Sequence, residues 1–348
     1  MPQITIVPTG QRFAADPGEN VLAAALRAGL NLPHSCKGGH CASCRARVLS
    51  GSFDYPAERP AGLTAQEAEA GYVLLCQARA LTDLTVEAHE MRPAPDVEVK
   101  SLPCRIDRME RVADDVMAVF LRLPAVEPLH FRAGQYVDVM LSEGRRRSFS
   151  IASAPTDGPL LELHVRRASS SGFTGQLFDS MRAGTLLRIE GPLGQFWFRN
   201  DSPRPALMIG GGTGYAPLRA MLRQLLAIGD RRPLTLYWGG RTSGDLYEDV
   251  WLTNVATVRP AFIYRPVLSE PDGDSFGAVR TGLVHEAVLA DFPDLSGYDV
   301  YASGPPAMIE AIRSSFVAHG LPREQLYFDS FDYAPDTVAR MKAVQPPF

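Results

Sequence analysis

Four of the five cysteines in this 348-residue chain form the pattern that most constrains its fold. Cys36, Cys41 and Cys44 follow one another with the spacing Cys-x4-Cys-x2-Cys, and Cys76 lies further along the chain. This is the spacing of a plant-type 2Fe–2S site, in which four thiolates hold two irons. Two glycines between the first two cysteines let the loop turn tightly, so that its backbone amides point at the sulfur atoms. The predicted ligands of a 2Fe–2S cluster are Cys36, Cys41, Cys44 and Cys76.

Zinc sites and disulfide bonds are the other common uses of cysteine, and both fit this chain less well. Zinc sites usually combine two short pairs of Cys or His ligands, whereas only Cys41 and Cys44 form such a pair here. Disulfide frameworks are typical of small secreted chains. The fifth cysteine, Cys104, lies beyond the cluster segment, and we expect it to be a small residue of a hydrophobic core.

The chain is longer than one ordinary domain, so two or three domains are expected. Hydrophobic residues make up 45% of it, and the formal net charge of −4 is too small to indicate a nucleic-acid partner or an electrostatic membrane anchor. No segment reaches the roughly 18 apolar residues of a spanning helix, and the N-terminus lacks the regions of a signal peptide. We therefore expect a cytoplasmic monomer without membrane or nucleic-acid partners.

Residues 1–92 hold the cysteine pattern and are expected to form one domain. Asn20 is placed to cap a helix over residues 21–28. The sequence Thr64-Ala-Gln-Glu67 is a capping box for a second, short helix that leads to Cys76. This segment contains eight Lys or Arg residues and nine Asp or Glu residues, a net charge of −1. A strongly acidic docking face is therefore not expected.

The rest of the chain divides by its hydrophobic pattern. Residues 93–100 have the proline-containing composition of a linker. Residues 101–202 contain short β-type runs separated by Gly and Pro, which predict an antiparallel, six-stranded β-barrel. Residues 203–332 alternate strands with helices, which predicts an α/β domain whose parallel sheet is covered on both faces. Residues 333–348 are expected to form a C-terminal tail, to which we assign no role.

A candidate flavin site lies in the predicted barrel. Arg147-Ser148-Phe149-Ser150 ends a strand, Leu163-His164-Val165-Arg166 belongs to a later one, and Gly172-Phe173-Thr174 opens a helix. A flavin dinucleotide needs a cation for its pyrophosphate, an aromatic ring against its isoalloxazine, a small donor and a helix N-terminus. The first of these runs, by itself, is better explained by a strand end with a solvated arginine.

A candidate nucleotide site lies in the predicted parallel-sheet domain. The run Gly210-Gly-Gly-Thr-Gly214 follows a strand and opens a helix, which is the geometry that binds a phosphate on backbone amides. The helix has an apolar stripe at i, i+3, i+4 and i+7 that starts at Leu218. Close packing of this helix on the sheet would also explain the glycines. Gly304-Pro305-Pro306 lies at the end of another predicted strand.

Taken together and in this order, these motifs resemble those of the ferredoxin–NADP⁺ reductase superfamily. Because the cysteine segment comes first, the chain most resembles the NADH-dependent reductase components of bacterial multicomponent oxygenases. The resemblance extends to about Phe331. It implies a multidomain protein with an N-terminal plant-type ferredoxin domain of the α+β, β-grasp fold, an FAD-binding β-barrel domain and a Rossmann-like NAD-binding domain.

The resemblance also implies roles for the residues of the flavin site. Arg147 matches the arginine that holds the FAD pyrophosphate, and Phe149 stands where the family more often has a Tyr that covers one flavin face. Ser150 matches a hydroxyl near flavin N5 and is the first predicted catalytic residue. The later strand matches one that runs along the flavin, and the helix start matches its phosphate turn. The predicted FAD-binding residues are Arg147, Ser148, Phe149, Ser150, His164, Val165, Arg166, Gly172, Phe173 and Thr174.

For the nicotinamide nucleotide, the resemblance points to the glycine run and to neighbouring strand ends. Ser303 stands where the family commonly has a Cys beside the nicotinamide, and it is the second predicted catalytic residue. Arg241 and Asp245 lie near the expected ribose, and because no basic cluster accompanies Arg241, we favour NADH over NADPH. Phe331 fits either the second flavin face or a hydrophobic core. The predicted NAD-site residues are Gly212, Thr213, Gly214, Arg241, Asp245, Ser303, Gly304, Pro305 and Phe331.

These sites together predict an electron-transfer enzyme. NADH delivers electrons in pairs whereas a 2Fe–2S cluster accepts one at a time, so FAD between them separates the pair. We expect the electrons to leave through the ferredoxin domain, by transient docking, to a terminal oxygenase or hydroxylase for aromatic compounds, of the diiron or Rieske class. One alternative is the reductase partner of a CDP-deoxyhexose dehydratase, whose family shares this architecture. Another is a ferredoxin-type carrier or sensor with inactive reductase modules, which Ser303 favours.

Overall fold

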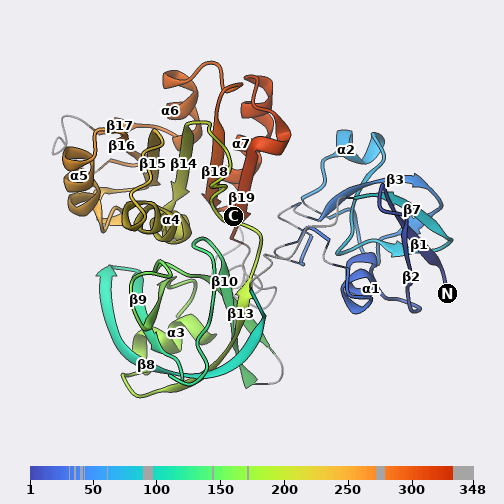
Figure 1. Cartoon of the computed structure of the whole chain (residues 1–348), viewed down its shortest axis with the longest axis horizontal. Coiled ribbons are helices and arrows are strands. Elements are labelled where there is room, and N and C mark those ends of the chain that lie inside the picture. Colours follow the sequence, from blue (N-terminus) through green and yellow to red (C-terminus); the bar gives the residue numbers. More distant parts are fainter. Residues whose placement is uncertain are drawn as a thin grey trace, which may run out of the picture. The chain divides into compact units, whose positions relative to one another are not determined.

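The computed structural model describes residues 1–30, 32–34, 37–39, 42, 44–60, 62–88, 97–142, 145–170, 172–271 and 279–331 (Figure 1). The chain forms two compact units, Met1–Val97 and Glu98–Phe348. The prediction of a multidomain protein is therefore confirmed. The predicted tail and the first half of the predicted linker, residues 93–96, lie outside the described residues, and Lys100, the last residue of that linker, already belongs to a strand.

Among its described residues, the first unit contains a five-stranded sheet, a two-stranded sheet and two helices. Its elements are β1 (Gln3–Val7), β2 (Gln11–Ala14), α1 (Val21–Arg27), β3 (Arg45–Ser50), β4 (Phe53–Asp54), α2 (Ala65–Glu69), β5 (Tyr72–Leu74), β6 (Arg79–Ala80) and β7 (Leu84–Glu87). The larger sheet has the order β2-β1-β7-β3-β5. Strands β1 and β7 run parallel, and the other described pairs are antiparallel. Side chains of this sheet pack with α1 in one apolar core.

Both helices of the first unit begin as the sequence predicts. The Asn20 side chain accepts a hydrogen bond of 2.8 Å from a backbone N–H of the first turn of α1. Thr64 and Glu67 form the capping box of α2, in which each side chain accepts from the backbone N–H of the other residue at 3.1 Å. Glu67 also pairs with the guanidinium of Arg45 in β3, so α2 is tied to the strand that follows Cys44.

Replacing Thr64 by Ala removes one half of the capping box and should lower the unfolding free energy of the first unit by about 1 kcal/mol. None of the described residues of α2 is buried, so core packing does not compensate for the lost cap. Hydrogen exchange of first-unit amides at increasing urea concentration measures the change. The Thr9 hydroxyl makes only bonds of 3.4 Å or longer, so Thr9→Ala is the control. Equal effects of the two variants would show that the box does not stabilise the unit.

The first half of the second unit is an antiparallel sheet. Its elements are β8 (Lys100–Ala113), β9 (Val116–Arg122), β10 (Tyr136–Met140), β11 (Arg146–Ser150), β12 (Leu160–Arg166), α3 (Gly172–Asp179) and β13 (Leu186–Leu193). The strand order is β11-β10-β13-β8-β9-β12, and an antiparallel bridge between Ile151 and Leu163 connects the chain after β11 to β12. Cys104 faces the core of this sheet, and burial raises the pKa of its thiol to about 12, as its predicted place in a core implies.

The second half of this unit is a parallel sheet with helices on both faces (Figure 1). Its elements are β14 (Ala206–Gly211), η2 (Gly212–Gly214), α4 (Tyr215–Ala227), β15 (Leu234–Gly240), η3 (Ser243–Asp245), α5 (Asp249–Val258), β16 (Phe262–Leu268), β17 (Arg280–Thr281), α6 (Val284–Asp291), β18 (Asp299–Gly304), α7 (Pro306–Ala318), η4 (Arg323–Gln325) and β19 (Leu326–Ser330). The strand order is β17-β16-β15-β14-β18-β19. Helices α4 and α5 share one core with Met208 and Trp238, while α6 and α7 share another with Ile209 and Tyr237.

The packing of α4 follows its sequence pattern. The apolar stripe that starts at Leu218 is completely buried against the sheet, as the helical spacing predicts. Because α4 follows the glycine turn η2 without a break, burial of this stripe also determines where the N-terminus of the helix lies.

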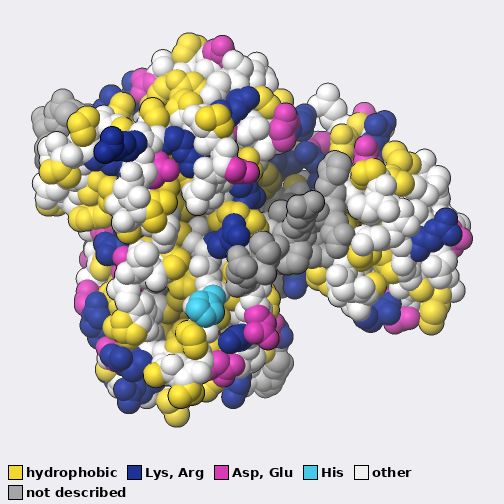
Figure 2. Space-filling view, viewed as in Figure 1, with side chains coloured by type: hydrophobic (Ala, Val, Ile, Leu, Met, Phe, Trp, Pro, Cys, Tyr) yellow, Lys and Arg dark blue, Asp and Glu magenta, His cyan; other side chains and the backbone are white. Residues whose placement is uncertain are grey.

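Within the described ranges, no helix is long and apolar enough to cross a membrane. On the face shown in Figure 2, acidic and basic side chains are interspersed with apolar ones, and neither sign covers a continuous area. This distribution agrees with the small net charge of −4.

Candidate functional site

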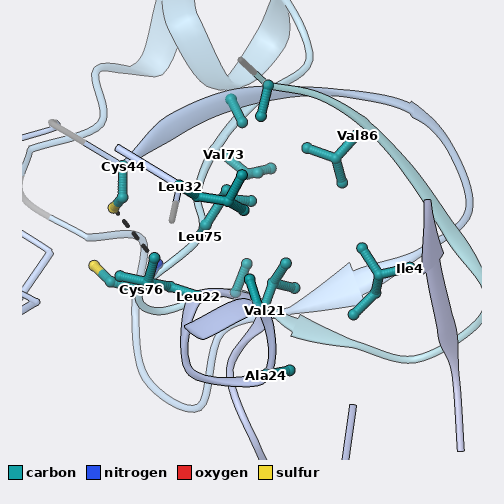
Figure 3. Close-up of a cluster of buried hydrophobic side chains, with 14 of the residues drawn as sticks. Ile4, Val21, Leu22, Ala24, Leu32, Cys44, Val73, Leu75, Cys76 and Val86 are labelled. Atoms are coloured by element: carbon teal, nitrogen blue, oxygen red, sulfur yellow. Dashed lines mark hydrogen bonds between the residues drawn. The ribbon is translucent and has the colours of Figure 1, made fainter. Parts of the chain in front are cut away.

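Two of the four predicted cluster ligands lie in the described part of the first unit. Cys44 precedes β3 and Cys76 follows β5, and both are buried, with 3% and 2% of their surface exposed. Figure 3 shows them side by side at one edge of the apolar core of the unit. The backbone N–H of Cys76 donates to Cys44 Sγ at 3.5 Å. Cys36 and Cys41 lie outside the described residues.

Backbone hydrogen bonds hold the two described ligands in place. The N–H of Leu75 donates to the carbonyl oxygen of Cys44 at 3.1 Å, and the N–H of Leu22 donates to the carbonyl oxygen of Leu75 at 2.9 Å. The first turn of α1 is thereby bound to the turn that carries Cys76. The helix cap at Asn20 therefore contributes to the position of a cluster ligand.

Residues 37–39 of the cluster loop are held against Gln77. The Gln77 side chain donates through Nε2 to the carbonyl oxygen of Lys37 at 3.0 Å and lies 3.9 Å from Cys76 Sγ. Gly39 has φ +83°, and a Cβ at this position would lie 2.8 Å from Gln77 Cγ. The turn thus requires glycine, as predicted. Gln77 was not predicted, and its place directly after Cys76 was the only signal in the sequence.

Phe149, in the outer strand β11, and Phe173, in α3, are brought together by the fold. Their ring centroids lie 5.7 Å apart. On the same strand, Ser148 Oγ donates to Asp138 Oδ1 at 2.6 Å, and Arg147 Nη1 donates to the backbone carbonyl of the preceding residue at 2.8 Å. Of this first group of predicted flavin residues, Phe149 therefore lies beside the start of α3, as a common site requires.

The start of α3 is a close-packed turn. Gly172 opens the helix with φ +81°, and Thr174 Oγ1 accepts a hydrogen bond from the N–H of Ala168 at 3.3 Å. A Cβ at Gly175 would lie 2.4 Å from the carbonyl oxygen of Ser170. Gly175, which was not predicted, is therefore as necessary to this turn as Gly172.

Ser150 lies where the two sheets of the second unit meet. It is buried, and its hydroxyl donates to Asp329 Oδ2 at 3.4 Å. Asp329 belongs to β19 at the edge of the parallel sheet and is the register partner of Ser303 in β18. The fold thus brings Ser150 close to the second predicted catalytic residue.

The predicted residues of β12 are engaged within the protein. The buried His164 ring lies 3.0 Å from Glu162 Oε1 through Nε2 and 3.0 Å from the Tyr247 hydroxyl through Nδ1. Val165 packs in the core of the antiparallel sheet. Both side chains are therefore engaged within the protein, and a contact of these residues with FAD stays a prediction.

The glycine run closes against the end of β18. A Cβ on Gly214 would lie 2.0 Å from the carbonyl oxygen of Ser303. Trp238 Nε1 donates to the carbonyl oxygen of Gly212 at 2.9 Å, and Gly210 pairs with Ser303 in the sheet. The two predicted nucleotide motifs meet at the carboxyl edge of the parallel strands, where open α/β sheets bind their ligands.

Ser303 is fully buried, and its hydroxyl has no hydrogen-bond partner among the described residues. Buried polar groups normally have a partner, so this hydroxyl is available to a bound polar group. Phe331 lies next to it in the fold, because its N–H donates to the carbonyl oxygen of Gly304 at 2.9 Å. Pro305 follows Gly304 and precedes α7.

The Asp245 carboxylate is engaged by two arginines. The N–H of Arg241 donates to Oδ2 at 2.9 Å, and Arg166 Nη2 donates to Oδ1 at 2.7 Å. Burial raises the pKa of Asp245, but the Arg241 N–H and the charge of Arg166 outweigh it and hold the pKa below its usual value. Asp245 therefore orients Arg166, while its contact with a ribose stays a prediction.

Three family models match consecutive segments of the chain. Residues 4–81 match the 2Fe-2S iron-sulfur cluster binding domain. Residues 103–198 match the oxidoreductase FAD-binding domain, and residues 208–314 match the oxidoreductase NAD-binding domain.

Similar proteins match over nearly their whole length. The CDP-6-deoxy-L-threo-D-glycero-4-hexulose-3-dehydrase reductase of Yersinia pseudotuberculosis is 37% identical over 94% of this chain and 98% of its own. The aromatic O-demethylase reductase subunit of an Amycolatopsis strain is 36% identical over 92% and 96%. A crystal structure of the Amycolatopsis cytochrome P450 reductase GcoB has a TM-score of 0.73 at 34% identity and covers 95% of this chain and 99% of that one. The chain belongs to the ferredoxin–NADP⁺ reductase superfamily.

This reductase is a flavin- and NAD-dependent oxidoreductase with a 2Fe–2S domain. The predicted enzyme class and the three predicted cofactors are confirmed at the level of its domains. The residue assignments stay predictions. All of them except Phe331 fall inside the matched segment for their cofactor.

The described residues of the reductase fit these groups. Cys44 and Cys76 offer thiolates at the edge of a core, with a backbone N–H beside one sulfur, which suits an iron–sulfur cluster. Phe149 offers an aromatic ring beside the start of α3. The close approach at Gly214 and the unpartnered hydroxyl of Ser303 suit a dinucleotide at the carboxyl edge of the sheet.

Replacing Gly214 by Ala should raise the KM for NADH about tenfold or more, because the added methyl displaces the Ser303 backbone at an overpacked contact. Steady-state NADH oxidation with an artificial acceptor measures the change, and flavin content reports whether the variant folds. In Gly244→Ala the new Cβ meets nothing closer than 3.9 Å, so this matched control should behave as wild type. A wild-type KM in Gly214→Ala would show that the turn does not contact the nucleotide.

Proposed function

We propose that this reductase serves a multicomponent oxygenase and passes electrons from NADH, through FAD and the 2Fe–2S cluster, to a terminal oxygenase or hydroxylase for aromatic compounds. One observation carries the proposal. Ser150, assigned to the flavin, donates to Asp329, and Asp329 is the register partner of Ser303, assigned to the nicotinamide. The two proposed catalytic serines are separated by a single residue. This proximity supports direct transfer of hydride between cofactors held in one orientation.

The proposed domains are a β-grasp ferredoxin domain over residues 1–92, an FAD-binding barrel over 101–202 and a Rossmann-like NAD domain over 203–332. The bridge that joins the outer strands of the antiparallel sheet supports a closed barrel. The parallel sheet with a core on each face supports the Rossmann-like assignment. Because β8 starts at Lys100, a linker that ends at residue 99 fits better than one that ends at residue 100.

In this proposal the chain binds and orients the flavin. FAD, when bound, accepts electrons as a pair and gives them up singly. Arg147 holds the pyrophosphate, and Phe149 covers one face of the ring, a position supported by its contact with Phe173. Ser150 presents its hydroxyl near the reacting edge. The backbone amides at the start of α3, from Gly172 onward, face a phosphate.

The nucleotide site favours NADH over NADPH. The amides of η2 face the nucleotide phosphates, and the buried Ser303 hydroxyl is the partner proposed for the nicotinamide. The Arg241 side chain lies 3.7 Å from Asp245 and 4.0 Å from Asp115. These carboxylates engage the arginine and would repel a 2′-phosphate, which disfavours NADPH. We propose that Phe331 covers the second face of the flavin.

A CDP-deoxyhexose dehydratase is the second candidate partner. The Yersinia reductase, whose name includes such a dehydrase, is 37% identical to this chain, against 36% for the aromatic O-demethylase subunit. Both candidates use the same electron path within the reductase, with transient docking through the ferredoxin domain. In either case we propose that the reductase works as a cytoplasmic monomer.

Anaerobic NADH should bleach the flavin absorption of the holoprotein and then produce the electron paramagnetic signal of a reduced 2Fe–2S cluster. In Cys76→Ala the flavin should still bleach, because its site lies in the second unit, whereas the cluster signal should be lost. Cys104→Ala, which removes the buried cysteine outside the cluster segment, is the control and should keep both signals. A wild-type flavin spectrum that NADH leaves unchanged would support the inactive carrier. Repetition with NADPH tests the coenzyme preference.

Reconstitution separates the two partner classes. The terminal component of an aromatic oxygenase, added with an aromatic substrate, should accelerate NADH oxidation only when that substrate is present. A CDP-hexose dehydratase with its own substrate should leave the slow background oxidation unchanged. The opposite pattern would establish the dehydratase as the partner.

A further inference from the structure

A buried arginine joins the two sheets of the second unit. Arg219 lies in α4, on the side of the parallel sheet that faces the antiparallel sheet (Figure 1), and its side chain is only 10% exposed. Its Nη1 donates to Glu162 Oε2 and to the carbonyl oxygen of Ala152, both at 2.9 Å. Its Nε donates to the Glu248 carboxylate at 2.9 Å. The first two acceptors belong to the antiparallel sheet and its continuation, and the third belongs to the parallel-sheet half.

The contacts continue beyond the arginine on both sides. The other oxygen of Glu162 lies 3.0 Å from His164 Nε2, and His164 Nδ1 lies 3.0 Å from the Tyr247 hydroxyl. The Tyr215 hydroxyl donates to Glu248 at 2.7 Å. We call Arg219, Glu162, His164, Tyr247, Glu248 and Tyr215 the seam network.

The seam network also reaches the glycine turn. Tyr215, the first residue of α4, stacks on Trp238 with ring centroids 4.0 Å apart and an interplanar angle of 21°. Trp238 Nε1 in turn donates to the carbonyl oxygen of Gly212 at 2.9 Å. An unbroken series of contacts therefore connects strand β12, which carries Glu162, to the turn η2.

Electrostatics keep this network in one arrangement. Burial lowers the pKa of Arg219, but Glu248 and Glu162 raise it above its usual value. Burial raises the pKa of Glu162, but the hydrogen bond to His164 and the charge of Arg219 bring it below its usual value. Both groups therefore stay ionised. Buried ion pairs seldom add stability over apolar packing of the same volume, and their best-attested use is to fix one register between elements.

We infer that Arg219 is a positioning residue for hydride transfer. It holds β12 and η2 at one separation, and thereby the flavin and the nicotinamide nucleotide that these elements bind under the proposed function. The atoms that exchange the hydride must lie within a narrow range of distances. A shift of one of them by about 1 Å can therefore lower the rate of hydride transfer about 100-fold. Arg219 is not among the residues proposed to touch either cofactor.

The same helix supplies a matched control. Arg223 lies one turn further along α4 and also joins the two sheets, through an ion pair of 2.6 Å with Asp157. Its side chain is 34% exposed, so solvent screens this pair and the side chains around it can adjust. Arg223 is not part of the proposed cofactor sites.

The experiment compares Arg219→Met with Arg223→Met in the holoprotein. Stopped-flow mixing with NADH, and with NADH deuterated at C4, measures the rate of flavin reduction, its isotope effect and the dissociation constant of NADH. In Arg219→Met the limiting rate should fall about tenfold or more with a change under about twofold in the dissociation constant. The long-wavelength charge-transfer absorption of the nucleotide–flavin pair should weaken, and Arg223→Met should match wild type in every measurement.

Glu162→Gln keeps the shape of the side chain and provides a second test if Arg219→Met fails to fold. It should slow flavin reduction in the same way. The variant with both Arg219→Met and Glu162→Gln should show a smaller fall in this rate than the product of the two single falls, because the two residues act through one contact. Arg219→Lys, which keeps the charge, should recover part of the rate. Two outcomes would overturn the inference. One is that Arg219→Met and Glu162→Gln both keep the wild-type rate of flavin reduction and the wild-type charge-transfer absorption. The other is that Arg219→Met and Arg223→Met lose the same part of that rate. A wild-type protein that NADH does not reduce would instead overturn the proposed function.

Discussion

The hydrogen-bonded ion pair of Arg219 with Glu162 is the buried charged contact that we infer sets how the two sheets of the second unit face each other. It joins the antiparallel sheet to the first helix of the parallel-sheet half. A buried charge tolerates few positions, because a lost partner cannot be replaced by water. The two sheets therefore have one favourable register. In that register Ser150 contacts Asp329, beside the strand that ends in Ser303 and Gly304.

The two units position their cofactor residues by different means. In the first unit, backbone hydrogen bonds and helix caps hold the segments that carry Cys44 and Cys76. The first turn of α1 binds the turn before Cys76, and the capping box of α2 reaches the strand after Cys44. In the second unit the candidate sites lie between elements that are distant in sequence, and side chains such as Arg166 and Arg219 connect them. In both units the contacts join segments that are distant in sequence, but the first unit uses mainly backbone groups, whereas the second uses charged side chains.

The sequence predicted those parts of the fold and site whose cause is local. The first three cysteines, the caps at Asn20 and Thr64, the stripe from Leu218 and the glycine run are each contained in one short segment, so that segment carries the signal. Only Cys76, 32 residues after Cys44, lies apart from its pattern. The side-chain partners of the polar residues on β12 were not predicted. His164 was assigned to the flavin strand, yet its ring bonds to Tyr247, 83 residues away. The sequence around a histidine in a strand does not indicate so distant a partner. Strand periodicity shows which face of the sheet the residue occupies, but not which side chain packs against it.

The sequence by itself determined the three cofactor domains and their order, since each depends on a motif whose spacing is dictated by the chemistry of thiolate ligands or of phosphate on backbone amides. Only the tertiary structure decided how the flavin and nucleotide elements face each other. Arg219 lies among the apolar residues of α4 and meets Glu162 across 57 positions of the chain. Such a pairing arises from the packing of two sheets, and no local pattern encodes the partner that a buried charge will find.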